Sequence, residues 1–190
     1  AWAAAVAHPA IYAGVPPIIV GGGPYDDSKV DDEFYWAATE LFITTKKDVY
    51  RSFMSKSPWY RKAAVDGGSW GGRSVMSWQS TAALGTMSLA VVPNAASPAD
   101  VAAARAAIVG AADTIRGWIE RQGYRVPVDQ GNVPWGSNSV VLNNAIVLGL
   151  AHDFRKDARY LSGVAAGMEY LLGRNPLDQS YVSGYGTRPL

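Results

Sequence analysis

The residues of this chain best suited to ion chemistry form an acidic run after a glycine-rich stretch. Five carboxylates fall within eight residues, at Asp26, Asp27, Asp31, Asp32 and Glu33. Such carboxylates repel one another unless a cation or a helix dipole compensates their charge. Calcium takes roughly six to eight oxygen ligands from carboxylates and backbone carbonyls, so a calcium site is one interpretation. The spacing is not that of an EF-hand, and an acidic cluster that caps a solvent-exposed helix is the other interpretation.

A tryptophan in a loop is the second candidate. Trp135 lies in the stretch 132–139, which is rich in Gly, Pro, Asn and Ser and directly precedes a helical pattern. An indole ring has a flat apolar face and a polar edge, which suits stacking on a sugar ring. The same ring could instead plug the end of a helical barrel, so the sequence leaves both interpretations open.

The third candidate is the segment that follows Gly173. Several of its side chains could bind a ligand rich in hydroxyl groups, namely Asn175, Asp178, Gln179, Ser180, Tyr181 and Tyr185. The alternative is a structured loop that ties Arg174 or Asp178 into internal bonds.

Composition excludes several classes of function. The chain has no cysteine, which rules out disulfides and thiolate metal sites. Lys plus Arg number 17 and Asp plus Glu 16, so the net charge gives no support for binding nucleic acid or an anionic membrane. No apolar run approaches the roughly 18–20 residues of a membrane span. The motifs of a serine nucleophile, a phosphate loop and a zinc protease are absent, and His8 and His152 are too far apart in sequence to indicate a metal pair.

The periodicity that must position these candidates is helical. Apolar residues recur from Phe34 to Phe42 at the spacing of one helix face, with acidic residues before them and lysines after them. Ser97 and Pro98 form a helix start signal, with the serine as the cap. The patterns predict helices over 31–47, 48–56, 80–92, 98–121, 137–154 and 157–172, with the end of another over 1–7. Ile18–Val20 is too short to build a sheet, so we expect an all-α fold.

A faint internal repeat predicts how these helices are arranged. Segment 37–50 resembles segment 145–160, because in each an apolar helix ends in a basic patch, an Asp caps the next helix and a Tyr follows in its first turn. This pattern favours a toroid or solenoid of antiparallel helix pairs, with the glycine-rich loops gathered at one working end. The chain has neither an initiator Met nor a signal-peptide pattern, and we expect both ends to be truncated.

Three segments together carry a family resemblance. Residues 21–38 contain Gly-Gly-Gly-Pro-Tyr-Asp-Asp and Asp-Glu-Phe-Tyr-Trp-Ala-Ala, and 135–145 contain Trp-Gly-Ser-Asn-Ser followed by Asn-Asn-Ala. Residues 170–186 read Tyr-Leu-Leu-Gly-Arg-Asn-Pro and then Ser-Tyr-Val-Ser-Gly-Tyr-Gly. In this order they resemble glycoside hydrolase family 9, the inverting cellulases. The resemblance implies an (α/α)6 barrel of six inner and six outer helices, of which residues 1–190 would be one partial catalytic domain supplying roughly the second half.

The resemblance also implies a set of site residues. A structural Ca²⁺ would bind the carbonyls of Ser28 and Lys29 and the carboxylates of Asp32 and Glu33. Another ligand would come from near Gln79, where members of the family often have Asp. In the cleft, Trp135 matches a sugar-stacking tryptophan, and Tyr25 and Tyr181 fall where residues line the substrate.

The activity implied is that of a secreted, extracellular endoglucanase. Its partners would be β-glucan or cello-oligosaccharide and the remainder of its own catalytic domain. The family's catalytic base precedes the segment matched here, and its His-His-Arg clamp and general-acid Glu follow it. Inversion needs two carboxyl groups roughly 6.5–9.5 Å apart, so we expect no catalytic residue in this chain and no activity from it alone. The alternatives are a non-catalytic helical-repeat binding module and an exo-acting or glucosamine-releasing relative of the barrel.

Overall fold

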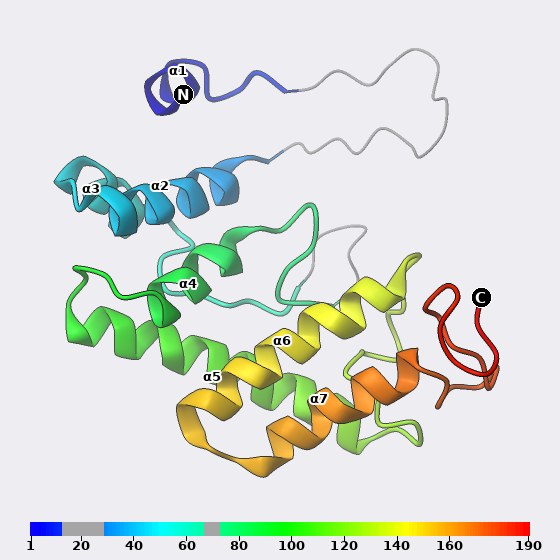
Figure 1. The fold of residues 1–190 in the computed structure, drawn as a ribbon. Helices are drawn as coiled ribbons and strands as arrows, with labels where there is room; N and C mark the ends of the chain where they lie inside the picture. The colour runs from blue at the N-terminus through cyan, green and yellow to red at the C-terminus, as the bar shows by residue number, and fades with distance from the viewer. Residues whose placement is uncertain (13–28, 67–72) are drawn as a thin grey trace, which may run out of the picture.

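The structure is a computed structural model that describes residues 1–12, 29–66 and 73–190 (Figure 1). Its helices are α1 (Trp2–Ala7), α2 (Asp31–Thr45), α3 (Asp48–Lys56), α4 (Ala82–Val91), α5 (Pro98–Glu120), α6 (Ser137–Arg155) and α7 (Ala158–Leu171). Within these ranges β pairing is limited to isolated bridges, Ser77 with Ser80 and Ser180 with Pro189. The all-α prediction is confirmed there, whereas Ile18–Val20 lies outside the described residues.

Local capping explains where the helices begin. The Ser97 side chain accepts a hydrogen bond from the Asp100 backbone N–H at 3.1 Å, and Pro98 occupies the first turn of α5, as predicted. Helix α4 begins two residues later than expected, at Ala82. The reason is that Ser77 and Ser80 exchange backbone hydrogen bonds of 3.0 and 3.3 Å, which keeps Ser80 in a turn.

The repeat seen in the sequence corresponds to two similar helix junctions. Lys46 ends α2 and Lys156 ends α6, and both adopt left-handed backbone angles, with φ of 59° and 55°. Asp157 caps α7 by accepting from the Arg159 backbone N–H at 2.9 Å. The predicted cap at Asp48 is wrong, because Asp48 is already the first residue of α3 and the capping residue before it is Lys47.

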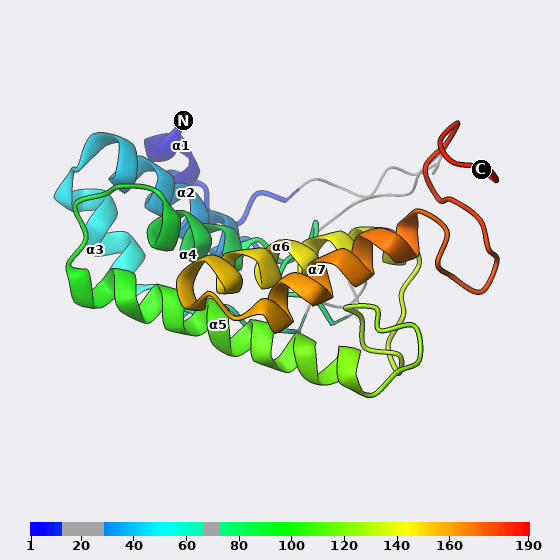
Figure 2. The same cartoon turned by 60° about the horizontal axis from the view of Figure 1, so that its bottom comes forward.

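The helices pack as neighbouring pairs. Helix α2 contacts α3 and α4, α5 contacts α4 and α6, and α7 contacts both α6 and α5. Figures 1 and 2 show α2, α4 and α6 running in one direction and α5 and α7 in the other. The starts of α2, α4 and α6 therefore lie at the same end as the loops 121–136 and 172–190. We call this end the loop face.

The buried apolar residues form two clusters. The larger core runs from α2 to α7 and includes Tyr35, Phe42, Leu89, Ile108 and Leu148. A smaller cluster lies under the loop face and contains Val126, Val128, Val140, Val141 and Leu171, with Tyr170 and Tyr181 packed against it. None of the described helices combines the length and the apolar character that crossing a membrane requires.

Candidate functional site

Trp135 is the most prominent side chain of the loop face. It is 92% exposed and immediately precedes Gly136, the residue that caps α6 with φ of 72°. The Ser139 hydroxyl donates to the Gly136 carbonyl at 2.8 Å and so fixes this turn. The described residues cover little of the ring, which leaves it accessible both to a ligand and to further segments of a barrel. A large apolar ring that faces solvent on a fixed turn can stack on a ligand ring.

Tyr181 is placed differently from Trp135. Its ring meets that of Tyr170 edge to face, with centroids 5.7 Å apart, and its backbone N–H donates to the Leu171 carbonyl at 2.8 Å. Burial raises the pKa of the Tyr170 hydroxyl, with a smaller contribution from Tyr181. Tyr181 is partly buried, so only part of its ring can meet a ligand. Tyr25, the other predicted cleft residue, lies outside the described residues.

The loop 172–190 is held by its own polar side chains. Asn175 is 6% exposed, and its amide nitrogen donates to the Tyr170 and Gln179 carbonyls, both at 2.7 Å. Its amide oxygen accepts from the Leu177 backbone N–H at 3.1 Å. Ser180 is also buried and bonded within the loop. These two side chains are therefore used to shape the loop, which favours the structural alternative for them.

The charged residues of this loop are likewise engaged. The Arg174 guanidinium donates to the Glu169 carboxylate at 2.8 Å and to the Tyr124 carbonyl at 3.1 Å, which links the loop to the 121–136 loop. Asp178 forms an ion pair with Arg188 at 2.9 Å.

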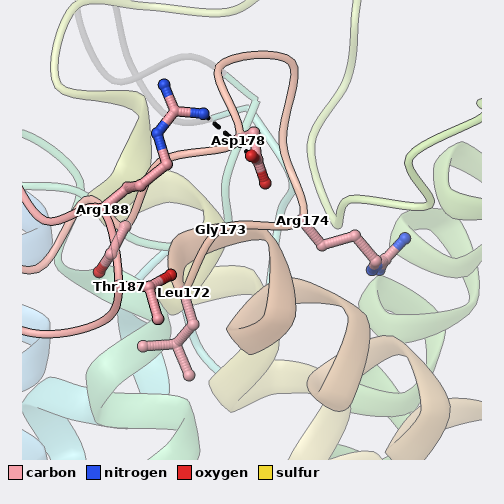
Figure 3. A pocket seen from close by; sticks show the side chains of 7 residues that line it. Leu172, Gly173, Arg174, Asp178, Thr187 and Arg188 are labelled. Carbon is pink, nitrogen blue, oxygen red and sulfur yellow. Dashed lines mark hydrogen bonds and ion pairs between the residues drawn. The ribbon is translucent and has the colours of Figure 1, made fainter.

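Between these charged groups lies a hollow of about 360 Å³, lined by Leu172, Gly173, Arg174, Asp178, Ser180, Thr187 and Arg188. Figure 3 shows Arg188 turned toward Asp178, whereas the Arg174 side chain points away from that pair. The hollow is therefore polar on one side. Its charged residues already form ion pairs, Arg188 with Asp178 and Arg174 with Glu169.

The acidic run at the start of α2 forms hydrogen bonds with two other segments. One Asp31 carboxylate oxygen accepts from the Trp59 indole N–H at 2.6 Å. Asp32 is 4% exposed, and its Oδ2 accepts from the Thr81 backbone N–H at 2.7 Å and from the Thr81 hydroxyl at 3.3 Å. Asp32 therefore ties the start of α2 to the residue that precedes α4.

The donors present are compatible with calcium only if backbone carbonyls take part. Among residues 1–12, 29–66 and 73–190, no group of three or more His, Cys, Asp or Glu side chains is placed to hold a metal ion. Both hydrogen bonds from Thr81 go to Oδ2 of Asp32. Carboxylates combined with carbonyls, such as that of Lys29, are a donor set that calcium accepts. Ser28 lies outside the described residues.

Sequence reasoning missed the polar residues that organise the loops. The Gln122 amide nitrogen donates to the carbonyls of Val126 and Val128, at 2.7 and 2.9 Å, and so folds the 121–136 loop onto the end of α5. Arg73 forms an ion pair with Asp129 at 3.1 Å, joining that loop to the segment before α4. The only signal in the sequence is polar residues beside apolar ones, which does not identify their partners.

Comparison with known proteins decides the family. The sequence matches glycosyl hydrolase family 9 over residues 1–190. The chain belongs to glycosyl hydrolase family 9. A cellulose 1,4-beta-cellobiosidase of Acetivibrio thermocellus is 48% identical to it, over 100% of this chain and 23% of that protein.

Solved structures of family 9 agree with the match. A metagenome-derived glycoside hydrolase family 9 endoglucanase superposes with a TM-score of 0.79 at 31% identity, over 93% of this chain and 31% of that one. The structure of AaCel9A in complex with a cellobiose-like isofagomine gives a TM-score of 0.77 at 26% identity, over 99% of this chain and 34% of that one.

These matches place the chain within a larger fold. Its helices form part of the (α/α)6 barrel of family 9, and the family consists of glycoside hydrolases. The chain spans 23% of the cellobiosidase and about a third of the two solved family 9 structures.

Proposed function

We propose that this chain is part of an inverting β-1,4-glucan hydrolase that cleaves internal bonds of cellulose or related β-glucans. The observation that carries the proposal is the match to glycosyl hydrolase family 9 along residues 1–190. The helix pairs with their loops at one end, and the likeness to a family 9 endoglucanase, support it further. Cellulose is too large to enter a cell, so we also propose that the enzyme acts outside it.

In this proposal the loop face contributes binding surface rather than the acid and base. Trp135 stacks on a glucose ring, and Tyr181, together with Tyr25, contacts neighbouring sugars. Two carboxylates in the loops of this face form ion pairs, Asp129 with Arg73 and Asp178 with Arg188. The two catalytic carboxyl groups would come from the rest of the barrel, so this chain by itself would be inactive.

A calcium ion is the proposed cofactor. Asp32 and Glu33, with the carbonyls of Ser28 and Lys29, would hold it at the start of α2. Its role would be structural, because it would neutralise the acidic run beside the Asp32–Thr81 contact and so stabilise the starts of α2 and α4. No catalytic step depends on it.

The test uses the longer protein that the proposal requires. We expect it to release reducing sugar from carboxymethylcellulose and to lower the viscosity of the solution early, as cleavage of internal bonds does. The products should carry the α-anomeric configuration at first, as inversion of a β-bond requires. Binding of cello-oligosaccharides without hydrolysis would instead support the non-catalytic binding module. Sugar release by purified residues 1–190 would contradict the assignment of both catalytic carboxyl groups to other segments.

Cleavage from chain ends is the second candidate, because the 48% identical relative is a cellobiosidase. It predicts cellobiose as the dominant product from the first minutes and little change in viscosity. Release of glucosamine from amino sugars would point to the third kind of barrel enzyme instead.

A further inference from the structure

We infer that Asn144 is a positioning residue of the loop face. Its buried amide joins the segment 73–77 to the 121–136 loop, and so sets the shape of the surface beside Trp135. This inference rests on the proposed function only where it concerns β-glucan, because the contacts themselves are structural.

Asn144 lies in the first half of α6 and is 0% exposed. Its Oδ1 accepts from the Ser74 hydroxyl at 3.1 Å. Its Nδ2 donates to the Pro127 carbonyl at 2.8 Å and to the Arg73 carbonyl at 3.4 Å. One side chain therefore uses both of its donors and one acceptor to connect α6 with two segments that are distant in sequence.

Other contacts also hold these two segments, but each of them either holds only one segment or is exposed to solvent. Asn143, next to Asn144, donates to the Met76 carbonyl at 3.0 Å and so holds only the first segment. Gln122 holds only the second. The Arg73–Asp129 ion pair joins both, yet the Arg73 side chain is 49% exposed, and exposed ion pairs contribute little because water screens them.

The buried position makes the Asn144 contacts decisive. A buried amide cannot exchange its partners for water, so losing one bond leaves a polar group unsatisfied. Ser74 is also 0% exposed, so neither side chain of this hydrogen bond can take a water molecule in place of the other. The segments 73–77 and 121–136 should therefore move relative to each other when the amide is changed.

This movement would reach the proposed binding surface. The 121–136 loop carries Trp135 next to its last residue and lines a hollow of about 180 Å³, together with residues such as Tyr170. The hollow lies between that loop, the start of α6 and the end of α7. A displaced loop would change how a sugar chain meets the indole ring without touching the reacting atoms, so binding should suffer more than turnover.

The experiment compares Asn144→Asp with Thr86→Val. Asn144→Asp keeps the shape and an acceptor for Ser74 but removes the donors to Pro127 and Arg73. Thr86→Val is the matched control: Thr86 is also 0% exposed, and its hydroxyl bonds to that of Tyr35 at 3.0 Å, between α2 and α4. Ser74→Ala is a milder second variant that removes one bond to the Asn144 amide, in case Asn144→Asp does not fold.

The first measurement is hydrogen exchange in residues 1–190 and in the longer protein. The backbone amides of Ser77, Val128 and Asn132 lie in the two segments and donate to the carbonyls of Ser80, Val126 and Asp129. We expect these amides to exchange about tenfold faster in Asn144→Asp. Thr86→Val should leave them unchanged. Equal exchange in Asn144→Asp, Ser74→Ala and the wild type would overturn the positioning role.

The second measurement is steady-state hydrolysis of a cello-oligosaccharide by the longer protein, well below the melting temperature of each variant. We expect KM to rise about fivefold or more in Asn144→Asp while kcat changes less than about twofold, with Thr86→Val unaffected. A KM for Asn144→Asp equal to that of Thr86→Val would refute the effect of Asn144 on saccharide binding. A wild-type protein with no hydrolysis would refute the proposed function, whereas hydrogen exchange would still decide the role of Asn144.

Discussion

Gly85 offers a test of how closely α2 and α4 are packed. A Cβ atom at this position would lie 3.0 Å from Cε1 of Tyr35 and 3.1 Å from the Cα of Trp36. The Tyr35 ring is fully buried and Trp36 Cα belongs to the backbone, so neither neighbour can rotate away. We therefore expect Gly85→Ala to push the two helices apart.

The magnitude follows from two opposing terms. Replacing a glycine inside a helix by alanine stabilises it by about 0.5–1 kcal/mol. Overpacking a well-filled core costs about 1–3 kcal/mol. The net change should be a loss of about 1–2 kcal/mol in the free energy of unfolding, which corresponds to a fall of roughly 2–8 °C in Tm for a chain of this size.

Gly110 provides the matched control. It lies in the interior of α5, is exposed, and a Cβ there would meet nothing within 4 Å. Gly110→Ala should therefore show only the helix term and raise the free energy of unfolding by about 0.5–1 kcal/mol.

Both variants can be followed by circular dichroism at 222 nm during urea and thermal unfolding, with a common slope in urea as the check on two-state behaviour. If Gly85→Ala is as stable as Gly110→Ala, the close packing of α2 on α4 is wrong.

Three other predictions concern the candidate site and the second helix junction. Trp135→Ala should change the free energy of unfolding by less than about 0.5 kcal/mol, because the side chain is 92% exposed. It should weaken cello-oligosaccharide binding by about three- to tenfold in calorimetric titration of the longer protein. A chelator should lower Tm and added Ca²⁺ should restore it, by up to about 2.7 kcal/mol of stability at a hundredfold excess over Kd. Asp32→Asn should abolish this response while Asp31→Asn preserves it, and a response that survives Asp32→Asn would exclude Asp32 as a ligand. The pKa of Asp157 is lowered to about 2, chiefly by hydrogen bonds from the Arg159 side chain. Its stabilising contribution should be complete above an unfolded-state pKa of about 3.9 and disappear as the pH falls through about 2. The Tm difference between wild type and Asp157→Asn should therefore vanish in that window, and a difference that persists below it would contradict the assignment.

Much of the fold could be predicted because its signals are local. The start of α5 follows from Ser97 and Pro98, whose side chains act within one turn. The bounds of α3 agree with the sequence pattern, since acidic and basic residues mark its ends. The start of α4 was less predictable, because the turn at Ser77 and Ser80 and the contact of Asp32 with Thr81 depend on a segment far away in sequence.

In the candidate site, too, some features follow from local sequence and others depend on contacts between distant segments. The sequence identified Trp135 as a possible platform, but the pattern of residues did not distinguish it from a plug. The 121–136 loop that carries it is held by hydrogen bonds from Gln122 to the Val126 carbonyl and from Asn144 to the Pro127 carbonyl. Calcium binding remains a prediction, as do the contacts of Tyr25 and Tyr181 with substrate.

The sequence by itself determined the helical class, most helix bounds and the resemblance to family 9, because these depend on residue types at short, fixed spacings. The tertiary structure decided which side chains are buried and hydrogen-bonded within the protein and which face outward. Asn175 and Trp135 both lie in loops rich in polar and small residues, yet the first is buried with its amide fully engaged and the second is exposed. The physical reason is that burial and hydrogen bonding are set by neighbours brought from distant parts of the chain, and no local pattern encodes those neighbours.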